Sequence, residues 1–270
     1  MFIFKSINKL NKKVNFKANI GFVPTMGSLH KGHISLIKES KKKCKMTLVS
    51  IFVNSSQFNN KKDFISYPRN LKRDIEILKK IKVDFLFIPV VKEIFKKKFK
   101  SIKIDKSDRI LCAKHRKGHF EGVLNIMNRL LYLIRSKNVF MGEKDFQQLY
   151  MIRKYLSKKY NVNIVNCKTV RDKNKIALST RNNLLSKNKY SQIIKIVKEF
   201  KLLKKRLLFN KNYLKISLFK MAKKIEKQYK IKIDYLEIRD EKKLKIPYKN
   251  KKFRLFVAFW IGKVRLIDNY

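Results

Sequence analysis

Two histidines stand three residues apart directly after a short apolar segment. Residues 20–25 are predicted to form a buried strand, and the sequence PTMGSLHKGH ends at His33, where a helical pattern begins. Residues at i and i+3 face the same way on a helical turn, and the free N–H groups of a first turn favour an anion. His30 and His33 are therefore predicted to be imidazole donors in a phosphate cradle. Taken alone, the pattern also fits two surface histidines at a helix cap, and its place behind a strand and a glycine-containing turn favours function.

Three further strand ends carry polar side chains of the kinds that substrates need. Gln57 in FVNSSQF is an amide able to donate to a carboxylate and accept from a hydroxyl. In MGEKDFQQ, Lys144 can reach a phosphate as a point charge, and Gln148 is a second amide. The segment ALSTRN places two hydroxyls beside Arg181. Each of these residues alone would be an ordinary polar loop residue, so their joint position decides the interpretation.

The elements that position these residues alternate between strand and helix. We expect strands at 20–25, 46–54, 83–89, 138–142 and 162–170, and helices at 33–43, 71–81, 123–134 and 145–160. This order predicts an α/β fold, a Rossmann-like parallel sheet with helices on both faces. Ligands of such sheets lie outside the carboxyl ends of the strands.

The pattern of predicted helices and strands changes after Arg171. Helical segments over 186–229 precede three strands at 232–238, 253–260 and 263–267, which predicts a second, smaller α+β domain. We expect a nucleotide-binding catalytic domain over 1–175 and a C-terminal lid domain over 176–270, with the boundary near 171–185.

The composition is strongly basic, with 69 Lys+Arg against 19 Asp+Glu and a formal charge of +50. The lysines are spread along the chain, and Lys, Asn, Ile and Phe all have A/T-rich codons, which favours compositional drift over a nucleic-acid partner. Three widely spaced cysteines argue against a zinc ribbon or a disulfide framework. The apolar runs are too short for a signal peptide or a membrane span, so we expect a soluble cytoplasmic protein.

Six motifs together resemble one enzyme family. PTMGSLHKGH, FVNSSQF, YPRNLKRD, GHFEGV, MGEKDFQQ and ALSTRN occur in the order and approximate spacing of the pantothenate synthetases, and LFVAFWIGKVRLIDN is similar to that family's C-terminus. The resemblance spans about residues 20–269. It implies a nucleotidyltransferase-type fold and the ATP- and Mg²⁺-dependent condensation of pantoate with β-alanine through a pantoyl adenylate. It also implies a homodimer, with no specific nucleic acid and no membrane as partners.

The resemblance also implies roles for individual residues. Gln57 and Gln148 would hold pantoate, and Asp74 would be a candidate magnesium ligand. Charge compensation at the phosphates would come from His30, His33, Lys144 and Arg181. The ATP site would comprise Met26, Gly27, Ser28, Leu29, His30, Lys31, Gly32, His33, Gly142, Glu143, Lys144, Asp145, Val170, Leu178, Ser179, Thr180 and Arg181.

Some positions depart from the family pattern. Ser55 stands where the family usually has proline, and Thr180 keeps a hydroxyl where it has serine. Lys175 replaces a glycine that is free to take positive φ, so we expect that turn to be reshaped. Arg73 precedes Asp74 where an acidic residue is usual, which weakens the case for Asp74 as a metal ligand.

Two other functions compete with this interpretation. Another nucleotidyltransferase would share the His-x-Gly-His signature, but the loops around Gln57 and Gln148 argue against it. A basic RNA-binding protein would show clustered cations with exposed aromatic residues, and the sequence shows no such clustering. His119 in GHFEGV is predicted to be mainly structural, anchoring the loop before its helix.

Overall fold

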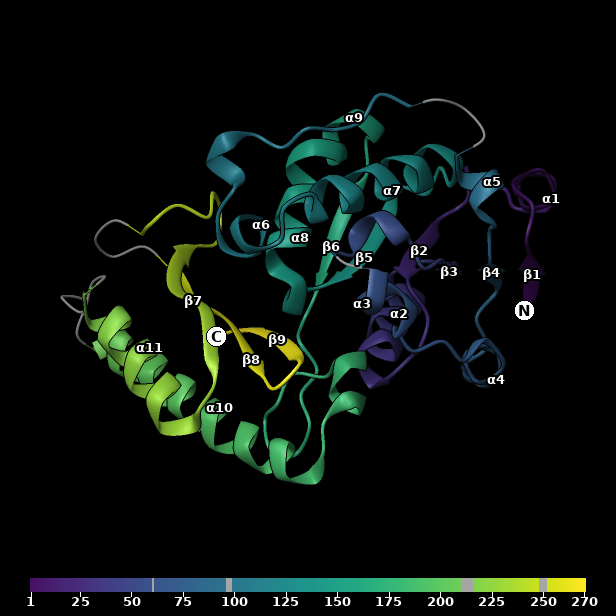
Figure 1. The fold of residues 1–270 in the computed structure, drawn as a ribbon. Coiled ribbons are helices and arrows are strands. Elements are labelled where there is room, and N and C mark those ends of the chain that lie inside the picture. Colours follow the sequence, from purple (N-terminus) through teal and green to yellow (C-terminus); the bar gives the residue numbers. More distant parts are fainter. Residues whose placement is uncertain (60, 96–98, 210–215, 248–251) are drawn as a thin grey trace. The chain divides into compact units, whose positions relative to one another are not determined.

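The computed structural model describes residues 1–59, 61–95, 99–209, 216–247 and 252–270, and it divides into two compact units (Figure 1). The first unit is Met1–Thr169 and the second is Val170–Tyr270. Within the described residues, no helix combines the length and the apolar character needed to cross a membrane.

The first unit is built on a six-stranded parallel sheet in the order β1-β4-β3-β2-β5-β6. This confirms the predicted α/β class. The edge strand β1, which the sequence did not indicate, pairs Phe2 with Phe85 of β4. The predicted strands 20–25 and 138–142 are present with the same bounds, whereas those predicted at 46–54, 83–89 and 162–170 are shorter in the structure. The strands are β1 (Phe2–Phe4), β2 (Ile20–Thr25), β3 (Met46–Ile51), β4 (Phe85–Phe87), β5 (Asn138–Gly142) and β6 (Asn163–Cys167).

Helices and short helical turns connect these strands. The predicted helix over 145–160 is interrupted, because a π-helical segment separates α8 from α9. The elements are α1 (Ile7–Lys13), α2 (Lys31–Lys43), η1 (Ser55–Gln57), α3 (Lys61–Ile65), α4 (Leu71–Lys80), α5 (Val91–Ile94), η2 (Lys106–Asp108), α6 (Leu111–His115), α7 (His119–Leu133), η3 (Glu143–Asp145), α8 (Phe146–Ile152), η4 (Arg153–Ser157) and α9 (Lys158–Tyr160).

Both faces of the sheet are covered. Phe22 and Val23 are neighbours in β2 and point to opposite faces, yet both are fully buried. Helix α2 lies close against β2, where an added Cβ at Gly21 would come within 2.1 Å of Ser40 Oγ on that helix. Glycine at this position therefore lets α2, which begins at the histidine motif, pack directly on the strand that precedes it.

The second unit is the predicted smaller α+β domain. Its antiparallel sheet has the order β7-β8-β9, and Phe200 of the long helix packs on Phe259 of β8 with ring centroids 5.7 Å apart. The elements are η5 (Thr180–Leu184), α10 (Lys187–Phe209), α11 (Ile216–Tyr229), β7 (Lys232–Asp240), β8 (Phe253–Ile261) and β9 (Val264–Asn269).

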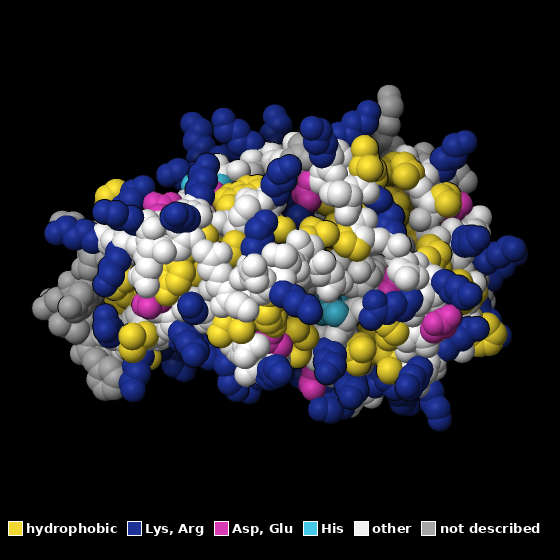
Figure 2. Space-filling model, turned by 60° about the horizontal axis from the view of Figure 1, so that its bottom comes forward, with side chains coloured by type: hydrophobic (Ala, Val, Ile, Leu, Met, Phe, Trp, Pro, Cys, Tyr) yellow, Lys and Arg dark blue, Asp and Glu magenta, His cyan; other side chains and the backbone are white. Residues whose placement is uncertain are grey.

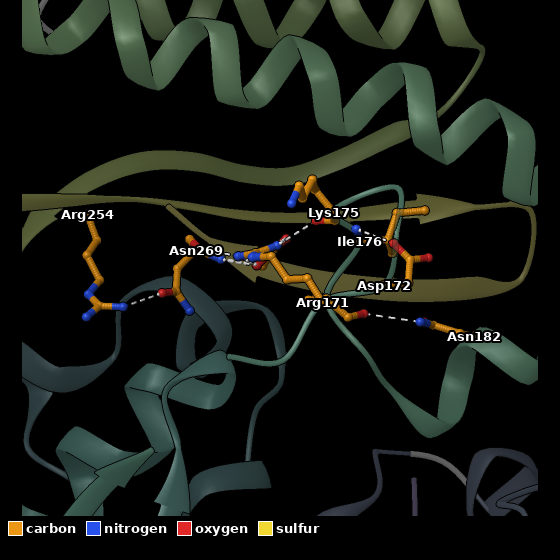
Figure 3. Close-up of polar contacts among 9 residues, drawn as sticks. Arg171, Asp172, Lys175, Ile176, Asn182, Arg254 and Asn269 are labelled. Carbon is orange, nitrogen blue, oxygen red and sulfur yellow. Dashed lines mark hydrogen bonds and ion pairs between the residues drawn. The ribbon is translucent and has the colours of Figure 1, made fainter. Parts of the chain in front are cut away.

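An arginine anchors the first turn of the second unit (Figure 3). The Arg171 guanidinium donates to both carboxylate oxygens of Asp268 on β9, at 2.7 and 2.8 Å. The following turn closes through a bond from Lys175 N to the Asp172 carbonyl at 3.0 Å. Lys175 takes the positive φ, +67°, for which a glycine was expected. The lysine therefore tolerates the left-handed conformation, and the hydrogen bonds of the turn hold it there.

The positive φ of Lys175 should reduce the stability of the second unit. A left-handed conformation costs a non-glycine residue about 1–2 kcal/mol, and glycine's greater unfolded-state entropy offsets roughly half of that gain. We expect Lys175→Gly to raise the free energy of unfolding of the second unit by about 0.5–1 kcal/mol. Urea unfolding followed by the fluorescence of Trp260, the single tryptophan, reports on this unit.

The matched control is Lys173→Gly, an exposed lysine in the same turn whose φ is not positive. This change should give no gain, because only the entropic cost of glycine remains. An equal stabilisation by both variants would show that the left-handed conformation of Lys175 is not strained.

Candidate functional site

The topology of the sheet brings the predicted residues of the first unit to one edge. Strands β3, β2 and β5 are consecutive neighbours and parallel, so their carboxyl ends lie side by side. The loop 26–30 follows β2, the turn that carries Gln57 follows β3, and the turn that carries Lys144 follows β5. This edge is where ligands bind in open α/β sheets.

The two histidines cap helix α2 reciprocally. His30 is the N-cap residue, and its Nδ1 accepts from the backbone N–H of Gly32 at 3.0 Å. The backbone N–H of His30 in turn donates to His33 Nδ1 at 3.3 Å, and the ring centroids lie 4.1 Å apart. Because Nδ1 of each ring accepts a hydrogen bond, each neutral imidazole must carry its proton on Nε2. The cap therefore fixes both rings as N–H donors.

Burial and a neighbouring positive charge keep both imidazole rings neutral. Burial is the main reason that the pKa of His33 falls from 6.5 to about 3, and the neighbouring His30 and Lys144 act in the same direction. Burial and then Lys144 lower the pKa of His30 to about 4, opposed by Asp145. At neutral pH the imidazoles are therefore hydrogen-bond donors rather than cations.

The positive charge beside the histidines belongs to Lys144. This residue lies in η3, directly after β5, and its side chain is largely buried, with Nζ 3.5 Å from Asp145 Oδ1. Its effect on the pKa of both His30 and His33 shows that the three groups share one electrostatic environment. Two neutral donors and one cation suit a group that carries several phosphate oxygens.

The backbone amides of the preceding loop are already occupied. Gly27 N donates to Thr25 Oγ1 at 3.2 Å. Ser28 N and Leu29 N donate to Asp74 at 2.7 and 2.8 Å. The sequence predicted free N–H groups in the first turn of the following helix, and the amides of Gly27, Ser28 and Leu29 precede that turn. Within the turn itself, Gly32 N already donates to His30 Nδ1. Asp74, the candidate metal ligand, is the acceptor for two of these loop amides.

The turn that carries Gln57 is held by the start of helix α7. The Gln57 carbonyl accepts from His119 Nδ1 at 2.6 Å and from Arg116 at 3.2 Å, and Arg116 also contacts His119 Nε2 at 2.9 Å. Since a guanidinium only donates, His119 Nε2 is the acceptor and Nδ1 carries the proton. An added Cβ at Gly122 would stand 2.1 Å from the Ser56 carbonyl oxygen. His119 was predicted to anchor a loop, but the sequence did not indicate that Arg116 joins it or that Gln57 is held. The one available signal was Gly122, a glycine directly before the predicted helix over 123–134.

The two adjacent glutamines at the start of α8 have different environments. Gln147 is buried, and its Nε2 donates to the carbonyls of Ile110 and Asp108 at 2.8 and 3.3 Å. Gln148 is only partly buried. Gln147 therefore holds the chain before α6. Gln148, the predicted substrate residue, is the more exposed of the two side chains.

The remaining predicted residues form a cluster within the second unit. Leu178 N donates to the Val170 carbonyl at 3.0 Å, so both ends of this loop lie together. Ser179 caps η5 by accepting from Arg181 N at 3.3 Å, and Thr180 is buried beside it. The cap presents Arg181 on the first turn of η5.

Because the histidines stay neutral in the folded protein, its free energy of unfolding depends on pH. Between about pH 6.5 and 3, His33 binds a proton in the unfolded chain but not in the folded one, so stability falls as the pH is lowered. We expect His33 to cost at most about 2 kcal/mol on going from about pH 7 to pH 5. Urea unfolding followed by circular dichroism should show a smaller acid loss in His33→Gln.

Ser35→Ala, in the first turn of the same helix, is the control; it changes no titratable group and should leave the pH dependence unchanged. If His33→Gln loses as much stability in acid as the parent chain, the imidazole is not held neutral by burial.

The chain is similar to known proteins in both sequence and fold. The family model described as pantoate-beta-alanine ligase matches residues 3–270. The pantothenate synthetase of Pseudothermotoga lettingae is 36% identical, over 100% of this chain and 98% of that protein. The Francisella tularensis pantoate-beta-alanine ligase, complexed with beta-gamma ATP and beta-alanine, has a TM-score of 0.83 at 36% identity, covering 100% and 97% of the two chains. The Thermus thermophilus enzyme reaches a TM-score of 0.90 at 29% identity, with 100% and 99% covered. The chain therefore belongs to the pantoate–β-alanine ligase family.

Proposed function

We propose that the chain condenses (R)-pantoate with β-alanine at the expense of ATP, through a pantoyl adenylate, and releases AMP and pyrophosphate. The observation that carries the proposal is the family match over residues 3–270 together with two neutral imidazole donors and Lys144 at adjacent strand ends. The Francisella relative was crystallised with beta-gamma ATP and beta-alanine.

The first step needs placement more than base catalysis. The carboxylate of pantoate is ionised at neutral pH, so its oxygen attacks the α-phosphorus as pyrophosphate leaves with the electrons of the broken P–O bond. Negative charge grows on the phosphate oxygens during this step. The Nε2–H groups of His30 and His33 donate to these oxygens, and Lys144 supplies positive charge. Neutral donors keep their hydrogen bonds without the cost of burying two further cations.

The second step joins the amine to the activated acid. The nitrogen of β-alanine attacks the acyl carbon, loses a proton, and AMP leaves as the amide forms. We assign Gln57 and Gln148 to pantoate because each is a neutral amide near the strand-end edge, and Gln57 also to the neighbourhood of β-alanine. The bonds from His119 and Arg116 occupy the main-chain carbonyl of Gln57, so they hold the turn without using its side-chain amide.

The remaining assignments follow the family resemblance. Residues 26–33 and 142–145 are assigned to ATP in the first unit, and Val170 with residues 178–181 in the second. An added Cβ at Gly142 would meet only Leu36 Cδ2, at 3.8 Å, so packing within the described residues does not require glycine there. Open space at this position suits the approach of an adenosine group.

We also propose that the enzyme uses Mg²⁺, forms a homodimer and is located in the cytoplasm. The family resemblance supports these three parts. Over the described ranges, no group of three or more His, Cys, Asp and Glu side chains could hold a metal ion. The proposal therefore assigns no protein ligand to Mg²⁺ and regards it as the ion that ATP carries on its own phosphate oxygens.

The reaction is tested by its products. With ATP, Mg²⁺, pantoate and β-alanine present, we expect AMP, pyrophosphate and pantothenate in equal amounts, and no AMP when pantoate is omitted. Formation of ADP instead of AMP would contradict adenylation.

Lys144→Ala should reduce turnover by a factor of about a hundred or more, because charge compensation in the transition state is lost.

The glutamines should determine acid binding rather than ATP binding. An unpaired polar group in a closed site costs roughly 1–3 kcal/mol, so Gln57→Ala and Gln148→Ala should each weaken pantoate binding about tenfold or more. The apparent ATP affinity should change much less, because neither amide carries charge for a triphosphate. Substrate titrations measure both affinities, with Gln228→Ala on the exposed face of α11 as the control. Loss of ATP affinity with intact pantoate binding would show that the two sites are wrongly placed.

A further inference from the structure

Asp74 does not fit the role of metal ligand that the resemblance implies. Its carboxylate is buried, with 2% of the residue exposed. Oδ2 accepts from Ser28 N at 2.7 Å, and Oδ1 accepts from Leu29 N at 2.8 Å. Protein-bound Mg²⁺ keeps several waters and near-octahedral oxygen ligands, which needs a carboxylate that faces an open space. Here both oxygens instead face backbone donors.

We propose that Asp74 is a positioning residue, which holds the loop of the two histidines in its working conformation, and that it does not bind magnesium. The proposal rests on the proposed function for its kinetic consequence, whereas its structural consequence holds without any substrate. Asp74 lies on a capped helix, the loop needs an anion at this point, and the anchored loop leads directly into the imidazole cap.

The anchor is rigid because Asp74 lies in the first turn of a capped helix. Asn70 caps α4 by accepting from Arg73 N at 3.1 Å, and Asp74 N donates to the Asn70 carbonyl at 3.0 Å. The positive end of the helix dipole favours a carboxylate in this turn. The charge of Asp74 is therefore stabilised by its own helix before it meets the loop.

The loop has a shape that calls for an anion. Gly27 and Ser28 both have positive φ, +77° and +51°. Consecutive backbone N–H groups in such a turn form a concave arrangement that binds negative charge. The approach is close, since an added Cβ at Gly27 would stand 2.9 Å from Asp74 Oδ2. The carboxylate of Asp74 thus occupies this concavity and stabilises a conformation that a serine rarely adopts.

The anchored residues lead directly into the cap. Leu29 is buried in the core below α2, and the next residue is His30, whose N–H and Nδ1 make the cap bonds. A shift of the Ser28–Leu29 peptide would change the direction of the His30 N–H and hence the hold on His33. Asp74 therefore acts on the donors through the loop, without contacting the substrate itself.

The test compares Asp74→Asn with Glu76→Gln, which removes the same charge from an exposed position of α4. An asparagine can accept from only one of the two amides, and its NH₂ group opposes the other. We expect faster amide hydrogen exchange at Ser28 and Leu29 in Asp74→Asn without substrates. Turnover should fall about tenfold or more, while the Mg²⁺ concentration that gives half-maximal activity stays unchanged. Glu76→Gln should leave all three quantities as in the parent.

Unchanged exchange at Ser28 and Leu29, or a rise in the half-maximal Mg²⁺ concentration in Asp74→Asn alone, would overturn the proposal. If Asp74→Asn does not fold, Gly27→Ala disturbs the same bonds from the loop side and should show the same faster exchange at Ser28 and Leu29. A parent chain without AMP-forming activity would refute the proposed function, whereas the exchange measurement would still decide the role of Asp74.

Discussion

A helix cap made of two imidazoles constrains the chemistry of the first unit. An N-cap side chain normally satisfies one orphan amide of the first turn. Here His30 and His33 each use Nδ1 for this purpose, so each neutral ring carries its proton on Nε2. Protonation would place a second hydrogen where a backbone donor already points, and burial opposes it as well. The cap therefore sets the tautomer of both rings, and burial keeps them uncharged.

Buried and half-buried polar side chains hold the loops of the candidate site. The Asp74 carboxylate holds the loop before the histidines, and the pair Arg116 and His119 holds the carbonyl of Gln57. A loop beyond the end of a strand has no ladder hydrogen bonds of its own, and its backbone groups need other partners. Side chains from α4 and from the start of α7 supply them.

The basic surface is consistent with compositional drift. Figure 2 shows Lys and Arg side chains scattered over the visible face rather than gathered in one stripe. Several of the few acidic residues have internal partners: Asp268 pairs with Arg171, Asp234 accepts from Trp260 Nε1, and Asp74 accepts from the loop. These three carboxylates thus stand where they stabilise the fold. Lysine, by contrast, extends its head group into water at little cost on most of the surface.

The sequence by itself determined the features that depend on short-range patterns. Apolar periodicity predicted the parallel sheet and the smaller α+β unit, because strands and helices repeat with different periods. The motif order showed which strand ends carry His30, Lys144 and Gln57, because residues next to a strand end stay there whatever the packing. Tertiary structure decided what depends on residues far apart in the chain. The contact of Asp74 with Ser28 spans 46 positions and that of His119 with Gln57 spans 62. The pKa values of His30 and His33 depend on burial by folded neighbours. No spacing rule encodes such contacts, because they form only when separate elements pack together.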